Sequence, residues 1–252
     1  MSIRIQKLSF HYRDFSLEID SLTVESARVT SIVGPNGAGK TTFLKCAGAI
    51  LPVRPGTCFI DGHDLARMKV RDRARHIGYV PQEHGSTFNY SVRDFVLLGR
   101  APFLSPFSIP SARDRGAAEE ALEFVGLVDY LPRPYFELSS GERRLVLIAR
   151  ALAQESDILL LDEPTTFLDP KHEVEIMDLA AKLASEKKKT VLVTLHNLDM
   201  AIKYSDYMVF MKKGRIFAYG KPQEILSEAL LETVYEIKMK IVPYNGTKII
   251  VR

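Results

Sequence analysis

Nine consecutive residues, Gly34 to Thr42, constrain the fold of this chain more than any other stretch. They read GPNGAGKTT and match the pattern G-x-x-x-x-G-K-[ST] at every specified position. Residues 28–33 before them are rich in β-branched side chains, which predicts a buried strand, and the apolar residues 43–49 after them predict a short helix. The motif therefore lies at a strand-to-helix turn, the context in which it forms a phosphate-binding loop.

The residue types in this loop suit a bound anion. Glycines at positions 34, 37 and 39 permit positive φ and let several N–H groups approach one anion, because no Cβ blocks the way. These N–H groups and the helix N-terminus stabilise negative charge. Lys40 adds a positive charge for the outer phosphates, and the Thr41 hydroxyl is a hard oxygen ligand that suits Mg²⁺. The alternative, a glycine-rich turn with a chance lysine, is disfavoured by the strand and helix context.

Composition and charge limit the possible classes of protein. Of the 252 residues 46% are hydrophobic and 26% are charged, which is typical of a globular chain with a substantial core. The net charge of +3 is too balanced to favour nucleic-acid binding. The chain has no run of about 18 apolar residues and no apolar signal core near Met1, so we expect a cytoplasmic protein that is not exported. Cys46 and Cys58 are expected to be packing residues rather than ligands or a disulfide.

The N-terminal segment predicts a pair of antiparallel strands. Residues 3–10 and 15–19 alternate between apolar and polar side chains, and Arg13-Asp14 forms the turn between them. Tyr12 lies at the end of the first strand. Its position alone is as consistent with packing as with function, but an adenine ring would need such an aromatic face to stack on.

Two adjacent carboxylates follow the most apolar strand of the chain. Residues 158–161 run apolar without alternation, which suits a central parallel strand buried on both faces, and they lead into Asp162-Glu163-Pro164. Ligands bind at this end of the strands in an open α/β sheet. Asp162 could therefore serve Mg²⁺, and Glu163 could orient and polarise a water towards a terminal phosphate. A charged strand exit without chemistry is the alternative.

Two other polar residues also follow predicted strands. Gln82 comes after the short strand 77–80, and His196 comes after the buried strand 190–195. Gln82 alone does not indicate a function, and a lone histidine more often has a structural role than a contact with a phosphate. Strands at 207–211 and 215–219, two short helices and a closing pair of strands at 239–242 and 247–251 complete the predicted order of elements.

From residue 83 to about residue 156 the pattern becomes helical. Ser91 and Ser111 are positioned to cap the first two helices of this segment. A third helix, 143–153, follows Leu138-Ser139-Ser140-Gly141-Glu142, whose hydroxyls and N–H groups either bind an anion or only cap the helix. Apolar side chains in the loops of this segment form an exposed docking patch or cover its own core, and both readings stay open. They are Phe88, Tyr90, Phe103, Leu104, Phe107 and Ile109.

In their order and spacing, these motifs resemble those of the ATP-binding cassette (ABC) ATPases over essentially the whole chain. A phosphate-binding loop alone occurs in many folds, and the signature between that loop and the two carboxylates narrows the assignment. The matching elements are the loop Gly34 to Thr41, Gln82, the signature Leu138 to Glu142, the strand into Asp162-Glu163-Pro164, Asp169 and His196.

The resemblance implies an α/β fold. Its core would be a P-loop NTPase core, a mostly parallel sheet with helices on both faces, to which an N-terminal antiparallel β subdomain and an inserted α-helical signature subdomain are added. We expect a single ABC ATPase domain over residues 1–252. The core with the β subdomain would take 1–83 and 157–252, and the helical subdomain would take 84–156.

The resemblance also implies that ATP and Mg²⁺ are the ligands and that two copies form a head-to-tail homodimer. Each ATP would lie between the phosphate-binding loop of one subunit and the signature of the other. Thr41, Gln82 and Asp162 would bind Mg²⁺. Glu163 would be the catalytic carboxylate, His196 would sense the γ-phosphate, and Lys40 and Gln82 would assist. The residues expected to bind ATP are Tyr12, Gly34, Pro35, Asn36, Gly37, Ala38, Gly39, Lys40, Thr41, Thr42, Ser139, Gly141 and Asp169.

Two residues depart from the pattern of this family. Ser140 stands where a second glycine is usual, and Arg144 stands where glutamine is common. The hydroxymethyl group of Ser140 either crowds the phosphate or adds a donor. We expect activity to survive, because Ser139, Gly141, Glu163 and His196 are all present.

Residues 91–100 and the proline-bearing loop after them resemble the importer ATPases that serve iron-siderophore, haem and vitamin B12 uptake and related metal or oxyanion systems. This resemblance implies a peripheral subunit at the cytoplasmic face of the cell membrane. Its partners would be polytopic permease subunits and, indirectly, a substrate-binding protein, with no nucleic acid. An exporter ATPase is the nearer alternative. A soluble ABC ATPase that acts on nucleic acid or ribosomes is the more distant one, because the chain has neither a long coiled-coil insertion nor a strongly basic face.

Overall fold

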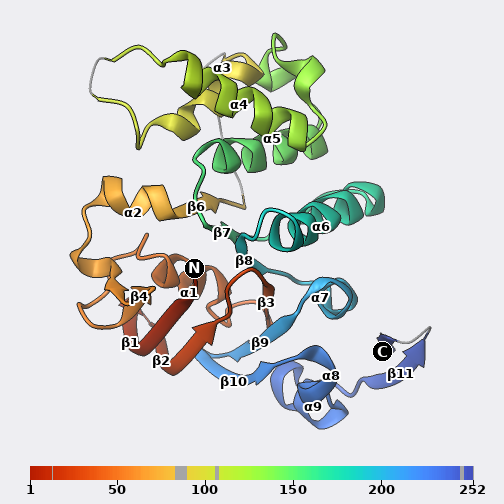
Figure 1. The fold of residues 1–252 in the computed structure, drawn as a ribbon. Coiled ribbons are helices and arrows are strands. Elements are labelled where there is room, and N and C mark those ends of the chain that lie inside the picture. Colours follow the sequence, from red (N-terminus) through yellow and green to blue (C-terminus); the bar gives the residue numbers. More distant parts are fainter. Residues whose placement is uncertain (13, 83–89, 106–107, 245–246, 252) are drawn as a thin grey trace.

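The computed structural model describes residues 1–12, 14–82, 90–105, 108–244 and 247–251. Within these ranges the chain forms two main sheets, a small antiparallel sheet and a larger, mostly parallel one (Figure 1). No helix in the same ranges is both long enough and apolar enough to cross a membrane.

The small sheet has four antiparallel strands in the order β2-β1-β4-β5. The first two strands are longer than their alternation predicts, because cross-strand pairing continues from Ile3 opposite Val24 to Tyr12 opposite Phe15. The strands are β1 (Ile3–Tyr12), β2 (Phe15–Val24), β4 (Cys58–Ile60) and β5 (His63–Asp64).

The larger sheet has six strands in the order β10-β9-β3-β8-β7-β6, and all neighbours are parallel except β10 and β9. Its strand β7 is buried along its whole length, which explains why its sequence is apolar without alternation. The strands are β3 (Val29–Val33), β6 (Ile77–Val80), β7 (Ile158–Leu161), β8 (Thr190–Thr194), β9 (Tyr207–Lys212) and β10 (Arg215–Gly220).

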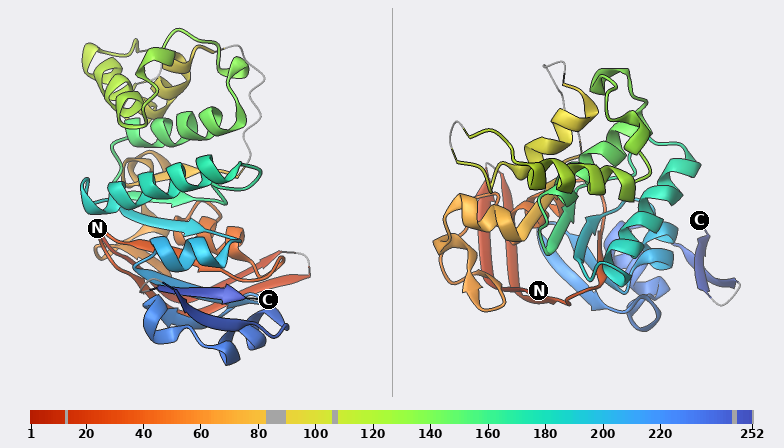
Figure 2. Two further views of the ribbon diagram at one scale, coloured as in Figure 1. Left: turned by 90° about the vertical axis from the view of Figure 1, so that its right-hand side faces the viewer. Right: turned by 45° about the horizontal axis from the view of Figure 1, so that its top comes forward.

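The helices lie on both faces of the larger sheet and beyond its β6 edge (Figure 2). The α-helices are α1 (Lys40–Ala47), α2 (Val70–His76), α3 (Val92–Leu97), α4 (Ala112–Phe124), α5 (Ser140–Ala153), α6 (Pro170–Ser185), α7 (Leu198–Tyr204), α8 (Pro222–Ile225) and α9 (Glu228–Tyr235). Short 3-10 turns occur at Leu65–Arg67, Leu98–Arg100, Val128–Tyr130 and Tyr135–Glu137.

Each face of the larger sheet packs against different elements. On one face Ile32, Leu160 and Leu192 share a core with α1 and the small sheet. On the other face Val33 and Leu161 share a core with α5, α6 and α7. Cys46 of α1 and Cys58 of β4 are buried in the first core as free thiols. The predicted fold class, a mostly parallel sheet covered on both faces with an antiparallel subdomain beside it, is confirmed.

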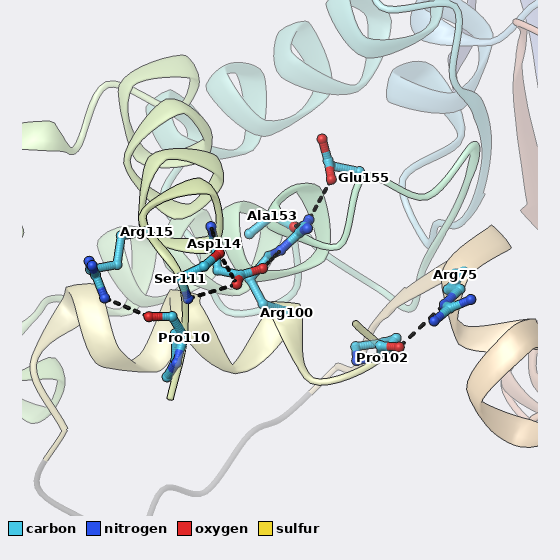
Figure 3. A network of polar contacts seen from close by, with 9 residues as sticks. All are labelled: Arg75, Arg100, Pro102, Pro110, Ser111, Asp114, Arg115, Ala153 and Glu155. Carbon is cyan, nitrogen blue, oxygen red and sulfur yellow. Dashed lines mark hydrogen bonds and ion pairs between the residues drawn. The ribbon is translucent and has the colours of Figure 1, made fainter. Parts of the chain in front are cut away.

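The helices α3, α4 and α5 form a separate layer at the top of Figure 1. Arg100 is only 2% exposed and joins them: its guanidinium donates to the carboxylate of Asp114 in α4 at 3.0 Å and to the carbonyl of Ala153 in α5 at 2.8 Å (Figure 3). It also pairs with Glu155 at 2.6 Å. The boundaries predicted for a helical subdomain, 84–156, remain a prediction.

The C-terminal strands form a hairpin of their own. β11 (Lys240–Tyr244) pairs with β12 (Thr247–Val251) in antiparallel register. The backbone N–H of Ile250 donates to the carboxylate of Asp199 at 2.9 Å, which ties the hairpin to α7. The closing pair of strands predicted from the sequence is therefore confirmed, and it stands apart from the two main sheets.

Four neighbouring strands of the larger sheet bring the predicted site residues to one edge. The strands β3, β8, β7 and β6 are adjacent and parallel, and their registers match Ile32 with Thr194, Val193 with Leu161, and Leu161 with Val80. Because parallel strands end at the same edge, the segments that follow them meet there.

Candidate functional site

The phosphate-binding loop is held in a conformation that only glycine tolerates at two points. Gly39 has φ 94°, and a Cβ there would lie 2.4 Å from the ring of Phe15. A Cβ at Gly34 would lie 2.1 Å from the carbonyl oxygen of Met211 in β9. The loop is therefore pressed between β2 and β9, and its last residue before α1 starts the helix in left-handed conformation.

Lys40 begins α1 and is 5% exposed. Its ammonium group donates to the carbonyl oxygens of Gly34 at 3.0 Å and Pro35 at 3.2 Å, so the side chain folds back over the loop. Burial lowers the pKa of this ammonium group, and the carboxylates of Glu163 and Asp162 partly oppose the shift. A charge held in this way is available to the phosphates of a ligand that enters the loop.

The Asp162 carboxylate collects three hydroxyl donors from three different elements. It accepts hydrogen bonds from Thr41 of α1 at 2.8 Å, Thr194 of β8 at 3.0 Å and Tyr79 of β6 at 3.0 Å. Burial and the nearby carboxylate raise the pKa of Tyr79, so its phenol stays protonated and remains a donor. Asp162 is 2% exposed, and this ring of donors is what compensates the burial of its charge.

The neighbouring carboxylate, Glu163, is held between two other predicted residues. The amide of Gln82 donates to Oε2 at 2.6 Å, and Nε2 of His196 lies 2.6 Å from Oε1. The backbone N–H of Glu163 donates to the hydroxyl of Thr194 at 2.7 Å. Glu163 has φ 46°, a left-handed conformation that is strained for a glutamate and typical of functional sites.

Lys40, Glu163 and the partners of Glu163 border a cleft of about 840 Å³, within the size range of pockets for small molecules, whereas Asp162 is not part of its lining. Tyr12, which is 59% exposed, stands at its wall and offers the aromatic face predicted for a stacked base. The predicted residues that line the cleft are Tyr12, Asn36, Gly37, Gly39, Lys40, Thr41, Thr42, Gln82, Glu163 and His196. Gly34, Pro35 and Ala38 belong to the same loop but do not line the cleft.

The signature residues lie away from the cleft. Ser139 caps α5 in a capping box: its hydroxyl accepts from the N–H of Glu142 at 3.3 Å, and its own N–H donates to the Glu142 carboxylate at 2.8 Å. Hydrogen bonds that the carboxylate receives from the backbone and then the side chain of Ser139 lower the pKa of Glu142. A Cβ at Gly141 would lie 2.4 Å from the ring of His172 in α6, so the two helices touch there.

Asp169 belongs to this second group rather than to the cleft. It caps α6 by accepting from the N–H of His172 at 3.1 Å, and its carboxylate lies 2.6 Å from Nδ1 of the same histidine. The hydrogen bonds from His172 lower the pKa of Asp169. Within the described chain, Gly141 and Asp169 are therefore linked through His172, and neither these two residues nor Ser139 lines the cleft.

Sequence reasoning missed several residues of the site. Thr194 and Tyr79 were assigned only to strands, although their hydroxyls complete the shell of Asp162. The pairing of Tyr12 with Phe15 across the predicted turn was the signal that could have added Phe15. The other lining residues carry no signal in the sequence. The missed residues of the cleft are Phe10, Phe15, Lys45, Leu51, Thr166 and Phe167.

Comparison with known proteins identifies the class. The model of the ABC transporter family matches residues 17–166. The iron(3+)-hydroxamate import ATP-binding protein FhuC of Bacillus subtilis is 35% identical over 242 residues, which cover 96% of this chain and 90% of FhuC. The chain belongs to the ABC transporter family and is an ATP-binding ATPase subunit.

Two solved structures support the same conclusion. One is described as a metal-chelate type ABC transporter in an inward-facing conformation; it has a TM-score of 0.87 at 28% identity and covers 99% of this chain and 96% of its own. The other is the ATP-binding cassette MJ0796, a dimer in a post-hydrolysis state with ADP and Pi. It has a TM-score of 0.73 at 26% identity and covers 87% of this chain and 98% of its own.

Proposed function

We propose that this chain is the ATP-hydrolysing subunit of a membrane importer and that Glu163 is its catalytic carboxylate. The observation that supports the catalytic role is the position of Glu163 between Gln82 and His196, next to the phosphate-binding loop. A carboxylate in this place can accept a proton from a water that attacks the terminal phosphate. The strained backbone at Glu163 directs the side chain into the cleft rather than along the strand.

The other residues of the cleft have separate tasks in this proposal. Tyr12 stacks on the adenine, and the loop with Lys40 holds the outer phosphates. Gln82 and His196 each contact one oxygen of Glu163, and a carboxylate has about four acceptor sites, so the carboxylate keeps capacity for a water while these two contacts hold it in place. His196 has a side chain that is 41% exposed and can turn from Glu163 to the γ-phosphate.

The donor atoms beside the loop fit Mg²⁺. The ion prefers oxygen ligands and usually takes only one or two carboxylates from the protein, with phosphate oxygens and waters completing its shell. The hydroxyl of Thr41 and the carboxylate of Asp162 lie 2.8 Å apart, and the side-chain oxygen of Gln82 is the third candidate. When bound with ATP, Mg²⁺ would neutralise charge on the phosphates.

Replacement of Glu163 by glutamine tests the catalytic part of the proposal. The change keeps the shape of the side chain but removes the base, so we expect ATP affinity within about threefold of wild type and turnover at least about 100-fold lower. Glu175→Gln on α6 is the matched control, because Glu175 pairs with Lys171 and lies outside the cleft. Hydrolysis by Glu163→Gln at the wild-type rate would assign the role of base to another group.

The importer part of the proposal rests on likeness to FhuC and to the metal-chelate type transporter. The chain would work as a homodimer, peripheral on the cytoplasmic face of the membrane, bound to polytopic permease subunits and supplied by a substrate-binding protein. The cargo would be an iron-siderophore, haem, vitamin B12 or a related metal or oxyanion compound.

Purification from native membranes, followed by reconstitution into vesicles, tests the importer assignment. We expect a polytopic permease to co-purify with the chain and ATP in the lumen of the vesicle to drive uptake of a radiolabelled ferric hydroxamate, haem or cobalamin. The Glu163→Gln complex is the control that should assemble without transport. Movement of the cargo only in the opposite direction would indicate an exporter, and salt-sensitive binding of DNA or RNA without a permease would indicate a nucleic-acid machine.

A further inference from the structure

Helix α5 is fastened to both ends of strand β6. At the start of the strand, the side-chain amide of Gln154 donates to the carbonyls of Ile77, at 2.7 Å, and Ala74. At its far end, the guanidinium of Arg144 donates to the carbonyl of Pro81 at 2.8 Å and to the carbonyl of Gln82. Hydrogen bonds from α5 thus hold the backbone at the start of β6 and just after its end.

Arg144 is suited to the second attachment. It is 8% exposed, and a guanidinium carries five N–H donors in a rigid fork, so one side chain can hold two successive backbone carbonyls. A glutamine, the residue common here in the family that the sequence resembles, has only two donors on one nitrogen. The attachment lies five residues after Ser139 on the same helix, a rise of about 7.5 Å.

The side chain of Gln82 points to the reacting centre. Its amide donates to Glu163 at 2.6 Å, and Glu163 in turn contacts His196. A backbone segment that is fixed by Arg144 therefore ends in a side chain that touches the proposed catalytic carboxylate. The path from the signature end of α5 to this carboxylate passes through Arg144 and Gln82.

We propose that Arg144 is a positioning residue, which fixes the main chain of Gln82 relative to the signature helix and thereby sets where the Gln82 amide lies against Glu163. This inference rests on the proposed function, since it gives Gln82 and Glu163 their roles. Arg144 does not touch the cleft itself. We therefore expect substitution of Arg144 to lower the rate of ATP turnover and to leave the affinity for nucleotide unchanged.

A double-mutant cycle between Arg144→Met and Gln82→Ala tests the proposal. The substitution at Gln82 removes the amide but keeps the backbone carbonyls that Arg144 holds. We expect each single variant to lower kcat about tenfold, with an unchanged Kd for ATP in Arg144→Met, and the double variant to be no slower than Gln82→Ala within about twofold. A purely structural role for Arg144 would instead give multiplied losses of about 100-fold in the double variant, and would overturn the proposal, as would an unchanged kcat of Arg144→Met.

Two further variants control for loss of an arginine and for loss of folding. Arg143 is the neighbouring arginine, but it donates to the carbonyls of Leu138 and Phe136 within its own segment, so Arg143→Met should leave kcat within about twofold of wild type. Should Arg144→Met fail to fold, Arg144→Lys takes its place in the cycle: its ammonium can hold one carbonyl, and it should give an intermediate kcat with the same lack of additivity.

The outcomes also separate this proposal from the proposed function. If Gln82→Ala alone hydrolyses ATP at the wild-type rate, the role given to Gln82 is wrong and the role of Arg144 falls with it. If Gln82→Ala and Glu163→Gln are both slow while the losses at Gln82 and Arg144 multiply, the function stands and only the inference about Arg144 is rejected.

Discussion

At the scale of single residues, the cleft carries backbone strain at two neighbouring positions. Glu163 and Phe167 both have left-handed backbones, with φ of 46° and 63°. Phe167 is also 82% exposed, which is unusual for a large apolar side chain. An aromatic residue in this conformation is a rare outlier, and such outliers concentrate at functional sites. Both residues line the cleft, so a strained backbone occurs at two positions, four residues apart, along its edge.

The strain at Phe167 predicts that a glycine there stabilises the fold. Glycine adopts φ near 63° without the steric cost of roughly 1–2 kcal/mol. It also loses more entropy on folding, by roughly 0.5–1 kcal/mol, so Phe167→Gly should raise the free energy of unfolding by about 0.5–1 kcal/mol and the melting temperature by about 1–3 °C. Val174→Gly is the control with the opposite sign, because Val174 is a partly exposed residue inside α6, where glycine destabilises by roughly 1 kcal/mol. Thermal unfolding measures both. A lower melting temperature for Phe167→Gly would show that contacts of its ring outweigh the strain.

At the scale of elements, the helical layer depends on one buried arginine. Arg100 joins the end of α3 to α4 and α5 through Asp114, Ala153 and Glu155 (Figure 3). Hydrogen bonds from the side chain and backbone of Ser111, and then from Arg100, lower the pKa of Asp114 to about 2 from an ordinary value of 3.8. Asp114 thus serves both the cap of α4 and the buried guanidinium.

The lowered pKa of Asp114 predicts how the free energy of unfolding changes at low pH. A carboxyl whose pKa is lower in the folded state stabilises the fold fully above its unfolded value, and the contribution is lost as the pH falls from about 4 through about 2. Asp114→Asn should therefore be less stable at pH 7 by on the order of 2 kcal/mol, and the difference from wild type should shrink below about pH 4 and nearly vanish at about pH 2. Denaturant unfolding across this pH range measures the difference.

A control at Asp129 makes the prediction for Asp114 specific. Asp129 is an exposed aspartate of the same segment, and Asp129→Asn should follow the wild-type profile at every pH. A constant gap between wild type and Asp114→Asn down to pH 2 would mean that the amide disturbs packing and that the charge of Asp114 contributes nothing.

Local signals predicted the elements well where local forces decide them. Ser111 and Ser139 both form the capping boxes that their spacing to Asp114 and Glu142 allows, and the apolar run of β7 is a central strand. Tyr79 could not be placed on Asp162, because that contact depends on the register of β6 against β7, which no local pattern encodes. Side-chain contacts between strands, such as that of Tyr79 with Asp162, are fixed by the tertiary structure.

The apolar loop residues of the helical layer divide between the two open readings. The centroid of the Phe103 ring lies 4.1 Å from the guanidinium of Arg100, which is buried, and 5.4 Å from that of Arg75, which is exposed, so the ring covers the buried Arg100. Tyr90 packs on the main core, whereas Ile109 is 87% exposed. Phe88 and Phe107 lie outside the described residues. A docking surface at this loop therefore stays a prediction for Ile109.

At the scale of the whole molecule, the two segments predicted to bind phosphate, the glycine loop and the signature, do not line the same cleft within the described residues. The glycine loop and Lys40 border the cleft, whereas Ser139 and Gly141 lie against α6, beside Asp169 and His172. A second copy of the chain could place its signature over the cleft of the first. The related cassette MJ0796 was solved as a dimer with ADP and Pi, and that this chain dimerises in the same way is a prediction.

ATP-dependent assembly of the Glu163→Gln protein tests the arrangement. With hydrolysis blocked, the protein should sediment as a dimer in ATP and as a monomer without nucleotide. Adding Ser139→Glu places a negative charge where the phosphates of the partner's nucleotide would lie, so this double variant should stay monomeric at saturating ATP while its Kd for ATP changes less than about threefold. Ser185→Glu, an exposed position at the end of α6, is the matched charge control and should still dimerise. If Ser139→Glu dimerised equally well, the signature would not contact the nucleotide, and the two segments would have to act separately.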